Sequence, residues 1–183
     1  MQTRDLRMAA VAAPWGSLHV AVSGRGVVAL ETLTPRDIFL EGLERRFRRE
    51  IGQGRSDLLD EVVRQLEEYL RGERREFEVA VDLGDRPAWD RTVLAAVAEI
   101  PWGVTVSYGT LARAVDRPGA ARAVGGAVGR SPIGIVVPCH RVIAADGTLG
   151  GYGGDWFGSR ERGLDLKQEL LALEGLDIPR RRA

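Results

Sequence analysis

The sequence has few of the residues that form disulfides or bind structural metals. Its 183 residues include one cysteine, Cys139, and two histidines, His19 and His140. One cysteine excludes an intramolecular disulfide, and this set excludes the usual Cys/His zinc sites, so no metal is expected. The sequence also lacks a run of the roughly 20 apolar residues that a membrane-spanning helix needs, and its N-terminus lacks the apolar stretch of a secretory signal. We therefore expect a cytoplasmic protein whose lone thiol is either a small buried hydrophobe or a reactive group.

Lysine is almost absent, and arginine provides 25 of the 26 positive charges. The net charge of zero hides an asymmetry: residues 1–85 carry 13 basic and 16 acidic residues, and residues 86–183 carry 13 and 10. Residues 101–152 hold five arginines but only two acidic residues. This mild basic character permits contact with phosphates without demonstrating it.

The length suits one domain or two small ones. Composition changes after Gly84-Asp85-Arg86-Pro87, which is the best candidate linker. The sequence therefore predicts two domains, residues 1–84 and residues 85–183, in an α+β protein.

The first domain is predicted to begin with a β-meander over residues 8–33, because short apolar runs alternate with Pro/Gly turns. Thr34 is predicted to cap a helix that starts at Pro35, and Ser56 a second helix that ends at Gly72. Apolar residues alternate with polar ones over residues 77–81, which predicts one more strand.

The second domain is predicted to hold a helix over residues 88–100, followed by a helix-turn-helix. Its first helix spans residues 108–115, capped by Ser107, and its second spans residues 120–130. The second helix consists almost entirely of small residues and has Gly125 and Gly126 in its middle. Two such glycines cost about 1 kcal/mol each relative to alanine. Either close approach to another surface or tight helix packing would compensate.

The most informative segment is Pro138-Cys139-His140-Arg141, which lies between apolar runs. Lone cysteines are usually buried and inert. Neighbouring imidazole and guanidinium groups instead favour the thiolate that a nucleophile needs. Adjacency in sequence does not establish that these side chains converge, so both interpretations stay open from spacing alone.

With its neighbours, this segment resembles the O6-alkylguanine-DNA alkyltransferases, also called methylated-DNA–protein-cysteine methyltransferases. The motifs occur in the family's order and cover residues 87–175: Ile100-Pro101-Trp102-Gly103, Val106-Ser107-Tyr108-Gly109, Ala121-Arg122-Ala123-Val124-Gly125-Gly126-Ala127, Pro138-Cys139-His140-Arg141-Val142, Gly151-Tyr152-Gly153-Gly154 and Leu170-Leu171-Ala172-Leu173-Glu174-Gly175. The resemblance implies a ribonuclease-H-like N-terminal domain and a mostly helical, winged-helix-like C-terminal domain that contains the helix-turn-helix.

The resemblance also implies an activity: stoichiometric, irreversible transfer of an alkyl group from guanine O6, with O4-alkylthymine as a further candidate substrate, to the protein's own cysteine. Cys139 matches the acceptor, His140 the base that deprotonates it through a water, and Glu174 the carboxylate that orients the imidazole. Tyr108 matches a donor to the leaving guanine. No cofactor is implied.

A stacked base cannot reach a thiol, so the resemblance implies that a monomer binds double-stranded DNA and flips the alkylated base out. Arg122 matches the arginine that fills the gap in the stack. The small side chains would let the helix enter the minor groove. The implied DNA contacts are Arg122, Ala121, Ala123, Gly125, Gly126, Arg130 and Arg141.

The pocket for the flipped base is implied at Tyr152, Val142 and Gly153. The sequence departs from the family pattern at Ser131, where an asparagine usually braces the turn between the DNA-binding helix and the active-site strand. Serine offers fewer hydrogen bonds, so this hinge would be weaker or built differently.

A second departure is an insertion at about residues 155–162. It contains Trp156 and Phe157 and is predicted to be a surface loop, either a lid over the pocket or a locally packed segment.

Three other functions remain as alternatives: a protein that binds alkylated DNA without transfer, a helix-turn-helix regulator, and a cysteine hydrolase. Cys139 argues against a protein that only binds alkylated DNA, and the lack of a polar recognition helix argues against a regulator. Single turnover would distinguish this protein from a hydrolase.

Overall fold

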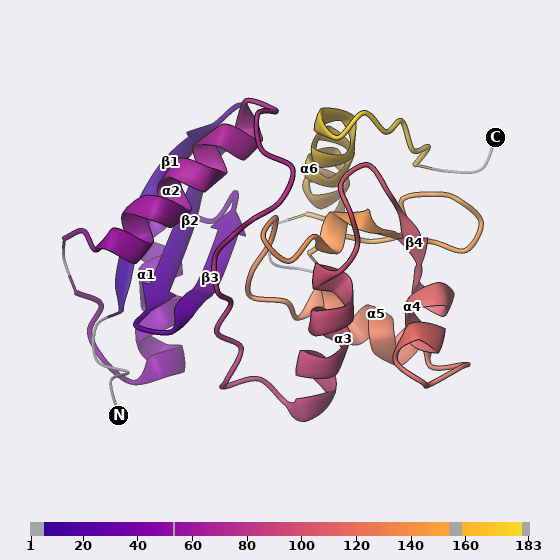
Figure 1. Cartoon of the computed structure of the whole chain (residues 1–183), viewed down its shortest axis with the longest axis horizontal. Helices are drawn as coiled ribbons and strands as arrows, with labels where there is room; N and C mark the ends of the chain where they lie inside the picture. Colours follow the sequence, from indigo (N-terminus) through magenta and orange to yellow (C-terminus); the bar gives the residue numbers. More distant parts are fainter. Residues whose placement is uncertain (1–5, 53, 154–158, 181–183) are drawn as a thin grey trace. The chain divides into compact units, whose positions relative to one another are not determined.

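The computed structural model describes residues 6–52, 54–153 and 159–180 of the chain (Figure 1). The fold separates into two compact units, Met1–Gly84 and Asp85–Ala183. The first combines a sheet with helices and the second is mostly helical, which confirms the predicted α+β class. Within the described ranges, no helix is both long and apolar enough to cross a membrane.

The first unit is built on the predicted β-meander. Strands β1 (Arg7–Ala13), β2 (Gly16–Ser23) and β3 (Gly26–Thr32) form an antiparallel sheet in sequence order. The first hairpin closes where Ala13 pairs with Gly16, and the second where Ser23 pairs with Gly26.

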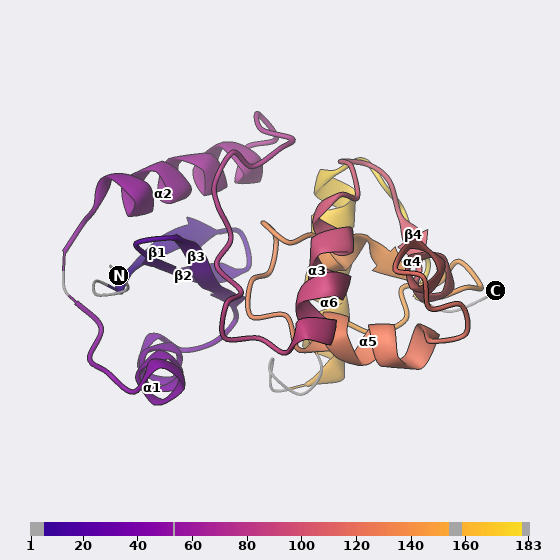
Figure 2. The same cartoon turned by 60° about the horizontal axis from the view of Figure 1, so that its bottom comes forward.

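Two helices cover opposite faces of this sheet, α1 (Arg36–Phe47) and α2 (Asp57–Leu70) (Figure 2). Because both faces are covered, residues 18–23 of β2 are buried without the alternation of a half-exposed strand. The prediction for Ser56 is confirmed, since its hydroxyl accepts from Leu59 N at 3.2 Å. The prediction for Thr34 is wrong: Pro35 is the N-cap residue, because its carbonyl accepts the first helical bond, from Phe39 N.

The predicted strand over residues 77–81 is also wrong. Only Val81 forms a bridge, to Val27 at the outer edge of β3, where Val27 N donates to Ala80 O at 2.8 Å. Earlier in the segment the main chain bonds to side chains, since Glu78 N donates to Gln65 Oε1 at 2.8 Å. A side-chain partner for a strand residue's N–H leaves no donor there for a sheet ladder.

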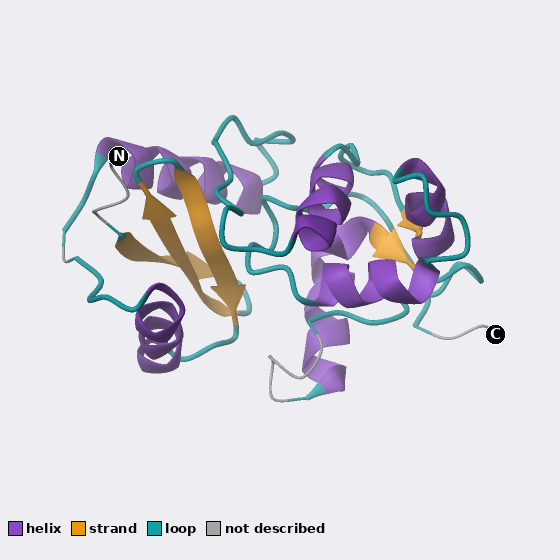
Figure 3. Ribbon diagram, turned by 90° about the horizontal axis from the view of Figure 1, so that it is seen from below, coloured by secondary structure: helices purple, strands orange, loops and turns teal. Residues whose placement is uncertain are grey.

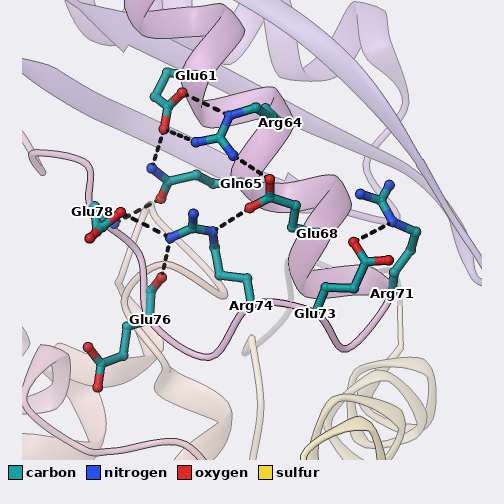
Figure 4. A network of polar contacts seen from close by, with 9 residues as sticks. All are labelled: Glu61, Arg64, Gln65, Glu68, Arg71, Glu73, Arg74, Glu76 and Glu78. Carbon is teal, nitrogen blue, oxygen red and sulfur yellow. Dashed lines mark hydrogen bonds and ion pairs between the residues drawn. The ribbon is translucent and has the colours of Figure 1, made fainter.

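A network of charged side chains holds this segment against the end of α2 (Figure 4). Arg74 donates to Glu68 Oε2 at 2.7 Å and to the carbonyl of Glu76 at 2.8 Å. Arg64 donates to Glu61 and Glu68 on the same helix. These contacts account for the alternation of Arg and Glu over residues 61–78 as a structural feature of the first unit.

The second unit contains α3 (Ala88–Ala98), a helix pair and a final long helix (Figure 3). The pair is α4 (Tyr108–Ala114) and α5 (Ala121–Gly129), joined by a tight turn, as the sequence predicted. Ser107 caps α4, since its hydroxyl accepts from Thr110 N at 3.1 Å.

Two short strands, β4 (Val106–Ser107) and β5 (Val142–Ile143), pair in parallel. The 3-10 helix η1 (Cys139–Arg141) leads directly into β5, and β4 leads directly into α4. This pairing brings the start of the helix pair beside the segment that carries the cysteine.

The long helix α6 (Arg160–Leu173) completes the unit. The predicted surface loop at 155–162 is wrong for its second half, because Ser159 is the N-cap of α6 and its hydroxyl accepts from Arg162 N at 3.2 Å. Trp156 and Phe157 lie outside the described residues, so the lid and the local-packing interpretations both remain predictions.

Candidate active site around Cys139

The segment before Cys139 is neither helix nor strand but a succession of tight turns. Val136 N donates to Gly134 O at 2.6 Å, which closes a three-residue turn around Ile135. Ile135 has φ +62°, a rare conformation for a β-branched residue. A second such turn follows, with Cys139 N donating to Val137 O at 2.7 Å. Ile135 and Val137 are buried, so packing holds this strained backbone in place.

Cys139 is buried, and its thiol is protonated at neutral pH. Burial raises the pKa of the Cys139 thiol to about 11, although a hydrogen bond with Ser131 and the charge of Lys167 oppose this shift. The nucleophilic thiolate is therefore not the resting form, and a base must remove the proton for the sulfur to react.

The neighbouring His140 is held by a carboxylate from the other end of the unit. His140 Nε2 lies 2.8 Å from Glu174 Oε1, and both side chains are fully buried. Burial alone would raise the pKa of Glu174, but hydrogen bonds from His140 and Arg141 lower it to about 2. An ionised carboxylate only accepts, so we assign the proton to Nε2. Nδ1 then carries the lone pair that can accept a proton.

Glu174 is itself fixed by three further groups. Arg141 donates to it through Nε at 2.9 Å and Nη2 at 2.8 Å, and Gly103 N donates to Oε2 at 3.1 Å. The predicted DNA contact at Arg141 is therefore wrong: its side chain is buried, bonded to Glu174 and to the carbonyl of Ile100. Two adjacent residues of the 3-10 turn, His140 and Arg141, thus converge on one carboxylate.

Lys167 is a part of this site that the sequence analysis did not identify. It is fully buried on α6, and Nζ donates to the carbonyls of Val142 and Leu149, both at 2.6 Å, and of Gly151 at 3.0 Å. Burial lowers the pKa of this amine. The signal was present, because Lys167 is the only lysine in a chain with 25 arginines.

Tyr108 contacts the same carbonyl, that of Gly151, as Lys167 does. Its hydroxyl is 3.5 Å from the carbonyl of Gly151, and its ring packs between two glycines. A Cβ at Gly125 would lie 3.7 Å from the ring, and one at Gly150 would lie 3.4 Å from it. At Gly125 the distance is that of an ordinary van der Waals contact, so the Tyr108 ring lies against α5 without requiring glycine there. Burial raises the pKa of Tyr108, so its hydroxyl stays protonated and able to donate.

The residues predicted to form the pocket include or directly follow the residues whose carbonyls accept from Lys167. Val142 is fully buried, and its carbonyl already accepts from Lys167. One lone pair of that oxygen remains to accept a hydrogen bond from a nucleobase. Tyr152 and Gly153 are half-buried, directly after Gly151. Burial raises the pKa of the Tyr152 hydroxyl.

Helix α5 presents the predicted DNA-binding side chains in part. Arg122 and Ala123 are exposed, and Ala121, Gly125 and Gly126 are partly so. The inward face consists of Val124, Ala127 and Val128. The exposed face therefore carries one long cationic side chain among very small ones.

Comparison with known proteins accounts for both units. The family model for the ribonuclease-like domain of 6-O-methylguanine DNA methyltransferase matches residues 6–83, and the model for its DNA-binding domain matches residues 88–176. The chain belongs to the O6-methylguanine DNA methyltransferase family. Its two-domain arrangement, ribonuclease-like and then DNA-binding, is that of the family.

Individual relatives agree with this assignment. A methylated-DNA–protein-cysteine methyltransferase of Mycolicibacterium paratuberculosis is 53% identical over 118 residues, which are 64% of this chain and 66%, slightly under two thirds, of the relative. The inducible methyltransferase of Bacillus subtilis is 34% identical and covers 89% of both chains. A solved structure of Mycobacterium tuberculosis OGT in complex with DNA has a TM-score of 0.74 and 38% identity, and covers 93% of this chain and 92% of that one.

Ser131, the residue predicted to form the hinge, bonds to Ile133. Its hydroxyl donates to Ile133 O at 3.2 Å and accepts from Ile133 N at 3.4 Å. These bonds span only two residues. Arg130, the predicted DNA contact just before it, donates twice to the buried carboxylate of Asp90.

Proposed function

We propose that this chain repairs alkylated DNA by transferring a methyl or larger alkyl group from guanine O6 to Cys139, once per molecule. The observation that carries the proposal is the 2.8 Å contact between His140 Nε2 and Glu174 Oε1, beside the only thiol of the chain. That contact leaves Nδ1 of His140 as the base, next in sequence to a thiol that needs one.

In the proposed transfer, the proton of the thiol goes to the protein and the electron pair of the broken bond goes to the substrate. His140 Nδ1 takes the Sγ proton of Cys139 through a water, the sulfur attacks the alkyl carbon, and the C–O6 bond breaks with its electron pair going to guanine. The hydroxyl of Tyr108 donates to the purine as negative charge develops. The product is a thioether, from which the alkyl group is not released, so each chain reacts once. O4-alkylthymine offers an equivalent alkyl–oxygen bond and is a further substrate.

The DNA side of the proposal rests on α5. A helix whose exposed face has only small residues beside Arg122 fits the minor groove, about 6 Å wide. Arg122 would occupy the gap left by the flipped base, and the protein acts as a monomer on double-stranded DNA. Because a free acceptor thiol persists only where thiols stay reduced, the proposal places the protein in the cytoplasm.

Mass spectrometry of the chain after incubation with duplex DNA containing O6-methylguanine tests the transfer. We expect one added methyl group per chain, on the peptide with Cys139, and saturation at one equivalent. Cys139→Ala should bind the DNA and gain no methyl group. Several turnovers per chain would indicate a hydrolase, and binding without methylation would indicate a protein that only recognises the lesion.

A second experiment separates flipping from chemistry. Arg122→Ala should slow repair of the duplex far more than reaction with free O6-benzylguanine, which needs no flipping. Equal slowing of both reactions would remove this role of Arg122. Strong preference for one DNA sequence would favour the regulator instead.

A further inference from the structure

An ion pair between a buried carboxylate and a half-exposed guanidinium joins the end of α5 to α3. Asp90, in the first turn of α3, has a side chain only 2% exposed. Arg130, the C-cap residue of α5, donates to it through Nε at 3.0 Å and through Nη2 at 2.7 Å. Both carboxylate oxygens are therefore used by one guanidinium, in the two-bond geometry that is strongest and most directional. Loss of Arg130 would leave the buried carboxylate of Asp90 without this partner, whereas the Arg130 side chain itself is half exposed.

Two further residues support this ion pair. Arg86 Nη2 donates to the carbonyl of Arg130 at 3.3 Å and lies 3.7 Å from Asp90 Oδ2. A Cβ at Gly126 would lie 3.1 Å from Arg130 Nη1, so glycine leaves the space in which the guanidinium folds back along α5.

The helix is tied to α3 at a second point as well. Trp89 Nε1 donates to the carbonyl of Ala123 at 3.3 Å, near the N-terminal end of α5. Neighbouring residues of α3, Trp89 and Asp90, thus hold the two ends of the helix. A helix fixed at both ends cannot rotate or tilt freely against its support.

The ion pair also lies at the start of the chain segment that leads to Cys139. Ser131 follows Arg130, and eight residues separate Arg130 from Cys139. The hydroxyl of Ser131 bonds to the backbone of Ile133, two residues away, and to the sulfur of Cys139. Neither bond connects the turn to α3, so among the polar contacts described here the connection to α3 at this end is made by Arg130 and Arg86.

We propose that Asp90 is a positioning residue for repair of duplex DNA: by pairing with Arg130 it fixes the C-terminal end of α5, and so the orientation of Arg122 relative to Cys139. Arg130 acts through this pair and not as a phosphate contact. The proposal rests on the proposed function, since it concerns the geometry of base flipping. It separates residues that orient the DNA-binding helix from residues that perform the transfer.

The test compares two rates in Asp90→Asn, an isosteric change that removes the charge. Repair of O6-methylguanine in duplex DNA should slow by about tenfold or more, whereas reaction with free O6-benzylguanine should stay within about twofold. Arg130→Gln should reproduce the effect and serves if Asp90→Asn does not fold, because the Arg130 side chain is half exposed. The double variant should be no slower than either single one, because both changes remove one interaction.

Asp165→Asn is the matched control, because Asp165 forms an exposed ion pair with Arg180 elsewhere in the same unit. It should leave both rates unchanged. If Arg130 instead contacts a phosphate, Arg130→Gln will lower the slope of log affinity against log salt by about one, and Asp90→Asn will not slow repair. That result, or equal slowing of both reactions in Asp90→Asn, would overturn the inference. Absence of methyl transfer by the unaltered chain would instead refute the proposed function.

Discussion

Lys167 Nζ donates to the carbonyl oxygen of Val142 at 2.6 Å, and this bond connects α6 to β5, the strand that follows Cys139. The same ammonium group holds the carbonyls of Leu149 and Gly151. One side chain therefore holds three backbone carbonyls that lie 16 to 25 residues before it in the sequence.

Lys167→Met keeps the length and apolar stem of the side chain and removes all three donors. We expect a loss of about 3 kcal/mol in the free energy of unfolding, because buried carbonyls lose their partners. Reaction with free O6-benzylguanine should slow as well. Urea denaturation and the rate of the single turnover measure the two effects. Unchanged stability would mean that water replaces the ammonium group.

The raised pKa of Cys139 predicts slow reaction with a general thiol reagent. A thiol with a pKa of about 11 has about two orders of magnitude less thiolate at pH 7.5 than an ordinary one. Iodoacetamide should therefore modify the native chain at least that much more slowly than the unfolded chain, and the native rate should rise with pH. Mass spectrometry follows both time courses, and equal rates would show that the thiolate is already present at neutral pH.

Glu174→Gln tests the contact with His140. The neutral amide leaves Arg141 without its buried counter-charge, which should cost about 3–5 kcal/mol of stability. The amide can also present a donor to Nε2 and favour the wrong tautomer, so the single-turnover rate should fall by about 100-fold or more. Glu169→Gln, an exposed change on the same helix, is the control and should have neither effect. A normal rate in Glu174→Gln would separate the carboxylate from the reaction.

His19 predicts a pH dependence in the first unit. It is buried on β2 against the ring of Phe39, and burial and the charge of Arg36 lower its pKa. The unfolded chain then binds the proton more readily, so stability is present above the ordinary histidine pKa of about 6.5 and falls as pH drops below it. His19→Leu should reduce the difference in stability between pH 7.5 and 5.5, measured by denaturation at both values. An undiminished difference would assign the effect to other groups, His140 first.

The sequence was sufficient for the elements whose signals are local. The meander, the caps at Ser56 and Ser107 and the helix pair depend on turn residues and periodicity within a few positions. The segment at 77–81 shows the limit of such signals. Its alternation is real, but Gln65 and Arg74 take up its polar groups, and no periodicity reveals a side chain from another element.

The candidate site likewise has parts that local sequence signals predict and parts that depend on residues far apart in the chain. The motif around Cys139 predicts the acceptor, but adjacency did not show that Arg141 points inward to Glu174. Glu174 lies 34 residues from His140, and its role came from the resemblance, because spacing alone gave no reason to connect them. Lys167 was missed because a cation on a helix is usually solvated, and only the fold shows that this one is buried.

The burial of the only lysine has a consequence for the outer surface. Among the described residues, both histidines are buried too, so every exposed cationic side chain there is a guanidinium. A guanidinium stays charged far above neutral pH and has no amine to acylate. The attraction of this surface for polyanions should therefore persist at alkaline pH, where a lysine-rich surface would discharge, and lysine acetylation has no side chain on it to modify.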